Sequence, residues 1–320
     1  MTEFEGRDRD VQNVVVADAF ATAPHGGVPI AVLPDGSSLT AAQLLSVASE
    51  LGAVGAVSVD DEDSLRYVSR QSSAGIVDAA IAGGWVGFER SSTEPGTCTI
   101  HTTDAGTPNT SDTQTEQETT THSVDFEILE QGTVTLDMPC LSVEDVDRTL
   151  NDVMEKLGMV IEPSTYSELS LPVGRVSGFG GKSLVVPIPH LQDVTDVEDD
   201  GVAIGGLLET SDTDRLVLLT FDTLEGINDV HARVFEQAGT ASERPVSGIG
   251  TAAIGAYLSH HEAYGGDRTA ISIESGRILD RPALSTTSLD AEPRITGRAI
   301  TVLDGKMLVP AAEDDDIIVA

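Results

Sequence analysis

The amino-acid sequence predicts an α+β protein made of two similar units. Strand-like apolar segments recur along most of the chain, and each half carries one nearly uncharged helix, Ile76–Glu89 and Ile249–Ser259. A helix that is apolar nearly all round is usually buried on every side. A chain of 320 residues has room for two domains of about 150 residues each. We therefore expect one central helix in each half and a site in the cleft between the halves.

The first half alternates strands and helices. Thr40 and Gln43 have the capping-box spacing that predicts the start of a helix, and Gly52 predicts its end. Gly83 and Gly84 lie inside the apolar helix and lower its helix propensity, so we expect another element to pack very close to them. Strands are predicted at Val11–Phe20, Ile30–Leu33, Val54–Val59, Leu65–Ser69 and Thr97–Thr102.

A polar insert follows these elements. Residues 107–123 contain no large apolar residue and are rich in Thr, Glu and Gln. This composition predicts an exposed loop or a disordered insert, with a partner-binding segment as the alternative. We place the N-terminal domain at residues 1–123 and the C-terminal domain at residues 124–291. The closing strands, at about residues 292–309, are expected to return to the N-terminal domain.

The second half begins with a predicted hairpin of the strands Val124–Leu129 and Thr133–Met138. Ser142 is a suitable helix cap, and the apolar spacing after it predicts an amphipathic helix that ends at Leu157. Further strands are predicted at Lys182–Pro187, Leu216–Thr220, His231–Phe235, Thr269–Ile273 and Ile295–Leu303.

The charge composition excludes several classes of function. Asp and Glu total 53 and Lys and Arg total 18, so the formal net charge is −35. Such a chain is repelled by nucleic-acid phosphates and by anionic membranes, so neither is an expected partner. The acidic, lysine-poor composition indicates a halophile, because a salt-rich cytoplasm screens the self-repulsion. Two cysteines cannot build a disulfide framework, and the polar start MTEFEGRDRD has no signal-peptide pattern, so we expect a cytoplasmic protein.

Five motifs occur in the order that is typical of one protein family. The first, DAFATAPHGGVPIAV (Asp18–Val32), is similar to an N-terminal signature in which Gly-Gly-Asn-Pro precedes an apolar strand. The other four are GFGGKSLVVPIP (Gly178–Pro189), HARVFEQAGTASERPVSGIGTAAIGAYL (His231–Leu258), GRILDRPALS (Gly276–Ser285) and RAITVLDGKMLV (Arg298–Val309). The chain thus resembles the PhzF-like proteins, which are relatives of the cofactor-independent diaminopimelate epimerases and proline racemases.

The resemblance implies a diaminopimelate-epimerase-like fold of two similar domains. In each domain a mixed β-sheet wraps round a central helix, and the active site lies at the domain interface. The resemblance also implies a homodimer that uses no cofactor and no metal, and a reaction that isomerises a small metabolite by proton transfer. A carboxylate-bearing metabolite is the expected ligand.

Several polar site positions of the family hold other residues in this chain. Gly55 stands at the usual glutamate, Asp78 at the histidine, Arg244 at the aspartate and Ile249 at the serine, while Val28 replaces the asparagine of Gly-Gly-Asn-Pro. Glycine cannot transfer a proton, and isoleucine cannot hydrogen-bond a substrate. We therefore expect the proton-transfer chemistry of the family to be lost or changed here.

Asp78 and Arg244 are the candidate catalytic residues, with two interpretations. In one, Arg244 clamps a substrate carboxylate and Asp78 acts as the base. In the other, the pair forms a salt bridge that closes the cleft. A Gly-rich turn before a helix can bind an anion through its backbone N–H groups, although such turns also occur for steric reasons alone. The candidate ligand-binding residues are Ser247, Gly248, Gly250, Thr251, Gly26 and Gly27.

Two functions therefore follow from the sequence. One is an isomerase or epimerase that acts on a small carboxylate metabolite. The other is a non-catalytic homologue that binds a small anion or a protein partner. The adjacent residues His260, His261 and Glu262 lack the i, i+3 or i+4 spacing of ligands on one helical face, so no metal site is expected.

Overall fold

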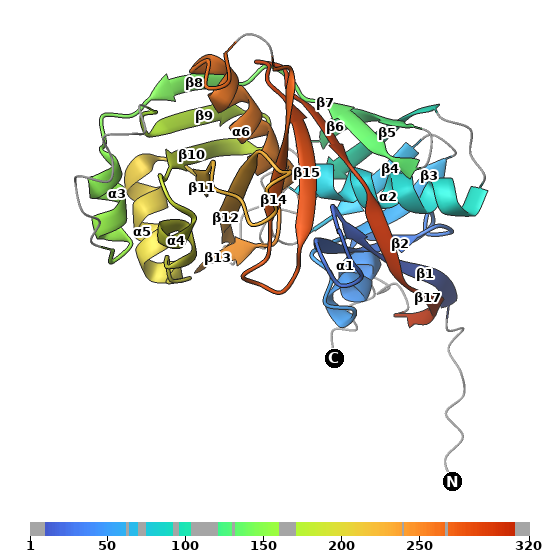
Figure 1. Cartoon of the computed structure of the whole chain (residues 1–320). Coiled ribbons are helices and arrows are strands. Elements are labelled where there is room, and N and C mark those ends of the chain that lie inside the picture. The colour runs from blue at the N-terminus through green and yellow to red at the C-terminus, as the bar shows by residue number, and fades with distance from the viewer. Residues whose placement is uncertain are drawn as a thin grey trace, which may run out of the picture.

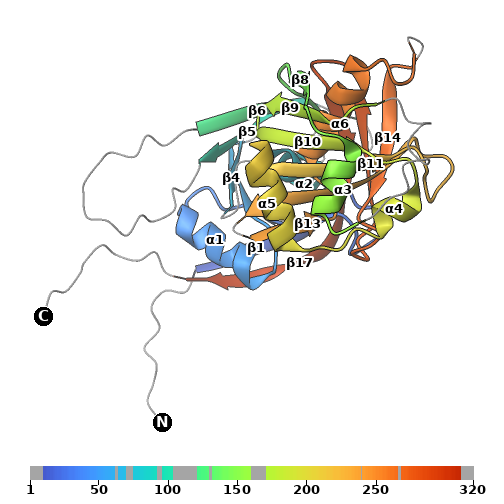
Figure 2. The same ribbon diagram turned by 90° about the vertical axis from the view of Figure 1, so that its left-hand side faces the viewer.

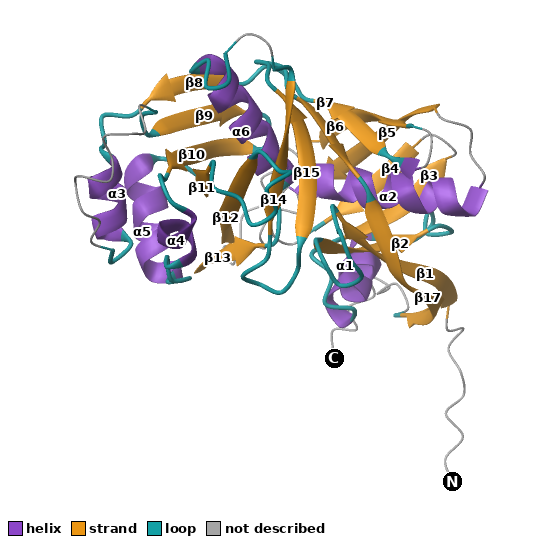
Figure 3. Cartoon of the chain, viewed as in Figure 1, coloured by secondary structure: helices purple, strands orange, loops and turns teal. Residues whose placement is uncertain are grey.

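The computed structural model describes residues 10–61, 64–69, 75–91, 96–103, 121–129, 132–159, 171–238, 240–265 and 268–310. Its strands form one continuous mixed sheet of 17 strands, which wraps round one helix in each half (Figure 1). Further helices cover the outer side of the sheet (Figure 3). The predicted α+β architecture, two similar units with a sheet around a central helix, is confirmed.

The first half surrounds the helix α2 (Ile76–Ser91) with strands from both ends of the chain. These strands are β1 (Asp10–Ala19), β2 (Val28–Leu33), β3 (Ala56–Asp61), β4 (Ser64–Val68), β5 (Gly96–Thr103), β6 (Thr121–Ile128), β7 (Val134–Asp137) and β17 (Ala299–Val309). They pair in the order β17, β1, β2, β3, β4, β5, β6, β7. The pairs β2–β3 and β4–β5 are parallel and the others antiparallel.

The helix α1 (Ala41–Glu50) lies on the outer face of this sheet, where Leu44 and Val47 pack against Leu33. The predicted capping box is confirmed. The Thr40 side chain accepts the N–H of Gln43, and the Gln43 side chain accepts the N–H of Thr40.

The two glycines inside α2 mark the closest approach of the sheet to the helix. A Cβ at Gly83 would lie 2.6 Å from Leu65 Cδ1, and one at Gly84 would lie 2.9 Å from Val134 Cγ2. Carbon atoms in contact normally stay about 3.5–4.0 Å apart. Only glycine therefore permits this packing of β4 and β7 on α2, which confirms the predicted close approach.

The second half surrounds α6 (Gly248–His260) with the remaining strands. These are β8 (Ser142–Asp145), β9 (Gly174–Gly178), β10 (Gly181–Pro187), β11 (Arg215–Thr220), β12 (Val230–Ala238), β13 (Thr240–Arg244), β14 (Ala270–Ser275), β15 (Ala283–Ser288) and β16 (Arg294–Gly297). The order is β8, β9, β10, β11, β12, β14, β15, β16, with β13 as a hairpin partner of β12. Because β16 also pairs with β7, the two halves share one sheet.

Three helices stack on the outer side of the second half (Figure 2). They are α3 (Leu150–Lys156), α4 (Leu191–Thr195) and α5 (Gly201–Ser211). Their apolar side chains form a separate core with β10, β11 and β12. The main core lies inside the sheet and includes residues of both central helices.

The strands β6 and β7, which we assigned to the second domain beginning at residue 124, lie with the first half. β6 pairs with β5, and Phe126 and Val134 pack against Gly84 of α2. An apolar strand pattern does not specify which sheet a hairpin joins, and this explains the difference. β17 pairs with β1, so the end of the described chain also lies in the first half. Most of the polar insert, residues 107–120, lies outside the described residues.

Two predicted elements are divided in the structure. The helix expected from Ser142 starts only after Thr149, whose side chain accepts the N–H of Asp152, and residues Ser142–Asp145 instead pair with β9. The strand expected at Ile295–Leu303 breaks at Arg298, whose carbonyl accepts the N–H of Phe20. In both cases pairing with a distant strand overrides the local pattern.

Candidate active site

The central helices α2 and α6 begin next to each other at the boundary between the halves. A Cβ at Gly248, the first residue of α6, would lie 2.5 Å from Val77 Cβ in the first turn of α2, so only glycine fits there. Asp78 follows Val77, and its Oδ1 accepts the N–H of Gly248 at 2.9 Å. The positive ends of two helix dipoles therefore meet at this carboxylate.

Asp78 and Arg244 lie together in this place, although 166 residues separate them. Arg244 Nη2 is 3.5 Å from Asp78 Oδ2, and the side chains are 10% and 1% exposed. This contact is longer than the 2.7–2.9 Å that is usual for an ammonium- or guanidinium-type hydrogen bond to a carboxylate. The juxtaposition that both interpretations of the pair require is therefore present, in a loose form.

Glu236 of β12 is a second, largely buried carboxylate in this cluster, with a side chain that is 12% exposed. Its Oε2 accepts a hydrogen bond from Arg244 Nη1 at 3.1 Å, and its Oε1 accepts from Arg215 Nε and from Ser247 Oγ, both at 2.8 Å. Arg215 also donates to Ser183 Oγ at 3.1 Å. Two carboxylates and two guanidinium groups thus form one connected network inside the sheet.

The sequence analysis missed Glu236 and Arg215, and a signal for each was present. Along β12, Glu236 is in phase with Ala232 and Val234, which belong to the inner core. Arg215 opens the strand RLVLLT, which is buried throughout and apolar between Arg215 and Thr220. A charged residue at an inward-facing strand position is uncommon unless it is paired with the opposite charge. Glu236 on one strand and Arg215 on another could therefore have been predicted to form an ion pair.

The environment separates the proton affinities of the two carboxylates. Burial raises the pKa of Asp78 from 3.8 to about 7, since Arg244 offsets only part of the effect and Glu236 adds to it. Burial also acts on Glu236, but Arg215 and Arg244 outweigh it and lower the pKa of that carboxyl to about 2. At neutral pH, Glu236 is therefore ionised, whereas Asp78 lies near the midpoint of its titration.

Tyr67 of β4 fills the space in front of Gly55. A Cβ at Gly55 would lie 2.5 Å from Tyr67 Cε2 and 2.8 Å from its hydroxyl oxygen. The phenol is buried and interacts electrostatically with Arg244, Asp78 and Glu236, and burial raises its pKa to about 12. The position that the resemblance assigns to a glutamate therefore faces a neutral tyrosine in this chain. Ile249, the other apolar replacement, is buried and packs over Gly180.

The turn at the start of α6 is occupied by groups of the chain itself. Ser247 Oγ accepts the N–H of Gly250 at 3.2 Å, and Asp78 accepts the N–H of Gly248. Thr251 donates its N–H to the Ser247 carbonyl, and its hydroxyl lies 2.9 Å from Ser285 Oγ. The anion at this helix N-terminus is thus the Asp78 carboxylate.

Gly26 and Gly27 are engaged in a different contact between the halves. Arg281 donates to the carbonyls of Gly27 and Gly26 at 2.8 and 2.9 Å and to Asp18 Oδ1 at 3.0 Å. The N–H of Gly27 points to the carbonyls of Arg281 and Pro282, both at 3.2 Å. These glycines therefore close the β1–β2 loop onto the second half.

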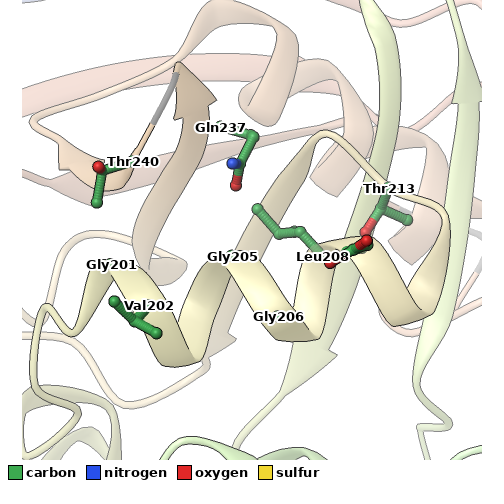
Figure 4. A pocket seen from close by; sticks show the side chains of 9 residues that line it. Gly201, Val202, Gly205, Gly206, Leu208, Thr213, Gln237 and Thr240 are labelled. Atoms are coloured by element: carbon green, nitrogen blue, oxygen red, sulfur yellow. The ribbon is translucent and has the colours of Figure 1, made fainter.

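α5 carries a separate hollow on the outer side of the sheet (Figure 4). Its volume is about 480 Å³, and Gly201, Gly205, Gly206 and Gln237 are among its lining residues. Gln237 follows Glu236 along β12, so the two side chains point to opposite faces of the sheet. This hollow is consequently distinct from the Asp78 cluster.

Within the described parts of the chain, no group of three His, Cys, Asp or Glu residues is arranged to hold a metal ion. His261 Nε2 lies 3.5 Å from Asp145 Oδ1, and its ring meets that of His260 edge-on, with 4.9 Å between the ring centroids. Neither cysteine forms a disulfide, and Cys98 is buried whereas Cys140 is exposed. None of the helices in the described residues is long and apolar enough to cross a membrane.

Comparison with known proteins identifies the family. Residues 17–305 match the family model described as phenazine biosynthesis-like protein, PhzC/PhzF. The chain therefore belongs to this family. Among curated proteins, none matches the chain.

Solved structures share the fold over nearly the whole chain. A PhzF-family phenazine biosynthesis protein of Bacillus anthracis is 19% identical with a TM-score of 0.73, and the match covers 93% of this chain and 99% of that one. A predicted epimerase of Pseudomonas aeruginosa is 16% identical with a TM-score of 0.66, again covering 93% and 99%. A PhzF-family protein of Enterococcus faecalis is 17% identical with a TM-score of 0.63 and the same coverage.

Proposed function

We propose that this protein is an isomerase or epimerase of the PhzF type in which Asp78 transfers the proton and Arg244 binds the carboxylate of a small metabolite. One observation carries the proposal. Asp78 is buried at the meeting point of the two central helices, its pKa is raised to about 7, and it lies 3.5 Å from an arginine.

These properties are the ones that proton transfer at carbon requires. A carboxyl group with a pKa near the working pH both accepts and returns a proton. In the proposed reaction, ionised Asp78 removes a proton from the carbon next to the substrate carboxylate. The electron pair of the broken C–H bond delocalises into that carboxylate, where Arg244 stabilises the negative charge. Asp78 then returns the proton to a different carbon of the delocalised system, which completes an isomerisation. An epimerisation requires the proton on the opposite face of the same carbon, so with Asp78 as the single carrier the intermediate has to turn over in the site before it is protonated.

The loose contact between Asp78 and Arg244 supports a place for substrate. Arg244 Nη1 is held by Glu236 at 3.1 Å, whereas Nη2 is the atom that lies 3.5 Å from Asp78. A substrate carboxylate that takes the place of Asp78 at Nη2 therefore displaces the weaker of these two contacts. Gly55 has no side chain that transfers a proton, so Asp78 has to carry out both removal and return.

A non-catalytic homologue that binds a small anion or a protein partner is the second candidate. It is favoured because the charged groups of the network already bind one another: Asp78 caps α6, and Glu236 pairs with both arginines. In this interpretation the cluster closes the cleft between the halves and a ligand binds elsewhere. A cytoplasmic homodimer remains our prediction for both candidates, and light scattering in molar KCl measures the oligomeric state.

Proton NMR in D₂O tests the proposal. The purified protein is incubated in molar KCl with a panel of carboxylate metabolites, and loss of a carbon-bound proton signal reports exchange. We expect exchange by the wild type and none by Asp78→Asn. Asp18→Asn is the matched control, because Asp18 is also 1% exposed and paired with an arginine. Absence of exchange across the panel, or equal exchange by Asp78→Asn, would refute the proposal and favour the non-catalytic candidate.

A further inference from the structure

The two buried carboxylates share the two arginines unequally. Glu236 binds both guanidinium groups, at 2.8 Å to Arg215 and 3.1 Å to Arg244, and also accepts from Ser247. Asp78 has one guanidinium contact, at 3.5 Å, and one backbone N–H. The guanidinium groups are therefore concentrated at Glu236, although Asp78 is the more deeply buried carboxylate, at 1% exposed against 12%.

Arg215 is held in place beside Glu236 and cannot compensate Asp78 by direct contact. Its side chain is 2% exposed, and it is fixed by Ser183 Oγ and by the carbonyl of Gly180 in addition to Glu236. A guanidinium group held by three partners cannot turn toward Asp78. Glu236 in turn cannot leave Arg215 without losing its shorter guanidinium contact, at 2.8 Å, in a largely water-excluded place, which is costly. Arg244 is thus anchored at one end by a carboxylate that does not move.

We propose that Glu236 is the positioning residue of the site: by holding Arg244, it leaves Asp78 as the less compensated carboxylate and so makes Asp78, and not Glu236, the proton carrier. The role assigned to Asp78 here rests on the proposed function. The division of charge itself rests only on the geometry of the free protein.

The signs of the surrounding charges agree with this role. Arg244 on β13 and Arg215 on β11 stabilise the ionised form of Asp78, as does the N–H of Gly248 on α6. Glu236 on β12 destabilises the ionised form. Tyr67 on β4 is neutral over the same pH range, because burial raises its pKa to about 12. Glu236 is therefore the one charged group of this set that favours the protonated form of Asp78.

Two substitutions in the network have opposite expected effects on Asp78. Glu236→Gln removes the opposing charge and frees Arg244, so Asp78 should ionise at lower pH, by about one pH unit or more. Arg215→Gln removes a positive charge and lets Glu236 draw Arg244 closer, so Asp78 should ionise at higher pH. A loss of packing that admits water would instead lower the pH midpoint of the Asp78 titration in both variants. The opposite signs therefore distinguish positioning from a structural disturbance.

The midpoint is measured without substrate by infrared spectroscopy. The carbonyl stretch of a protonated carboxyl group is followed in molar KCl from about pH 5 to pH 9, where ordinary Asp and Glu side chains are ionised. The part of the band that is absent from Asp78→Asn belongs to Asp78. Glu243→Gln is the matched control, because Glu243 is also buried and paired with an arginine, Arg233, at 2.7 Å. We expect its Asp78 midpoint to equal that of the wild type.

The outcomes separate this inference from the proposed function. A midpoint that falls in Glu236→Gln and rises in Arg215→Gln supports the inference, even if no substrate shows exchange. Midpoints that stay at the wild-type value, or that fall in both variants, overturn it, even if the wild type catalyses exchange. Where Glu236→Gln fails to fold, a rise in Arg215→Gln supports the inference and a fall overturns it. Where Arg215→Gln fails to fold, Glu236→Asp, which keeps the charge, takes its place: a fall in Glu236→Gln without a fall in Glu236→Asp supports the inference, and a fall in both or in neither overturns it.

Discussion

Replacing Gly75 by alanine would place a methyl group against the hydroxyl of Tyr67. An ideal Cβ at Gly75 makes a severe clash with the phenol oxygen and lies 3.0 Å from Tyr67 Cζ. Tyr67 is 1% exposed, and the backbone at Gly55 closes off the other side of its ring, so the ring has little room to move. Overpacking of a core of this kind costs about 1–3 kcal/mol. We expect Gly75→Ala to destabilise the protein by this amount.

Removing the phenol oxygen should relieve most of the clash. In a Tyr67→Phe background the nearest remaining atom of the ring is the one 3.0 Å away, and a small tilt relieves that contact. Alanine also lowers the entropy of the unfolded chain relative to glycine, which stabilises by about 0.4–1 kcal/mol. Gly75→Ala should therefore be nearly neutral in the Tyr67→Phe background. The expected coupling between the two positions is about 1–3 kcal/mol.

Urea unfolding in molar KCl, followed by circular dichroism, measures the free energy of unfolding of the four proteins in this cycle. Gly87→Ala is the control in α2, the helix that begins directly after Gly75, because an ideal Cβ at Gly87 meets no atom within 4 Å beyond the backbone of its own helix. It should stabilise by about 0.4–1 kcal/mol. The reasoning is refuted if Gly75→Ala is as stable as the wild type, or if its cost is the same with Tyr67 and with Phe.

Three further predictions concern charge. The folded-state pKa of Asp78, about 7, lies above the ordinary 3.8, so its protonation stabilises the fold fully below about pH 4 and this contribution is lost as the pH rises through 7. Urea midpoints should therefore decline over this range, and an equally steep decline in Asp78→Asn would contradict the assignment. Arg281→Met leaves Asp18 buried without its guanidinium partner, at a cost of about 1–3 kcal/mol in urea unfolding, whereas Arg277→Met, in an exposed ion pair, should cost less than about 1 kcal/mol. Dialysis from molar KCl into dilute buffer should unfold the chain, which has a net charge of −35, and an unchanged circular dichroism spectrum would count against a halophile.

Short-range patterns in the sequence determined the local elements of this protein. Thr40 and Gln43 lie within one turn of each other, so their capping box depends on no distant residue. Gly83 and Gly84 interrupt an apolar helix, and this alone indicated that a neighbour packs against them. The five ordered motifs predicted the family, and the family predicted a sheet wrapped round a central helix in each half.

The tertiary structure decided how distant segments meet. The hairpin at residues 124–138 joins the first half because its side chains fit against Gly84, which is a property of the partner and not of the hairpin. The contact of Asp78 with Arg244 was expected from the alignment of two motifs. The structure shows that this contact is long, at 3.5 Å, and that Glu236, which the motifs did not single out, binds the other end of the same guanidinium at 3.1 Å. Inward-facing charges on separate strands acquire their pairing, and hence their proton affinities, only when the sheet closes and excludes water from them.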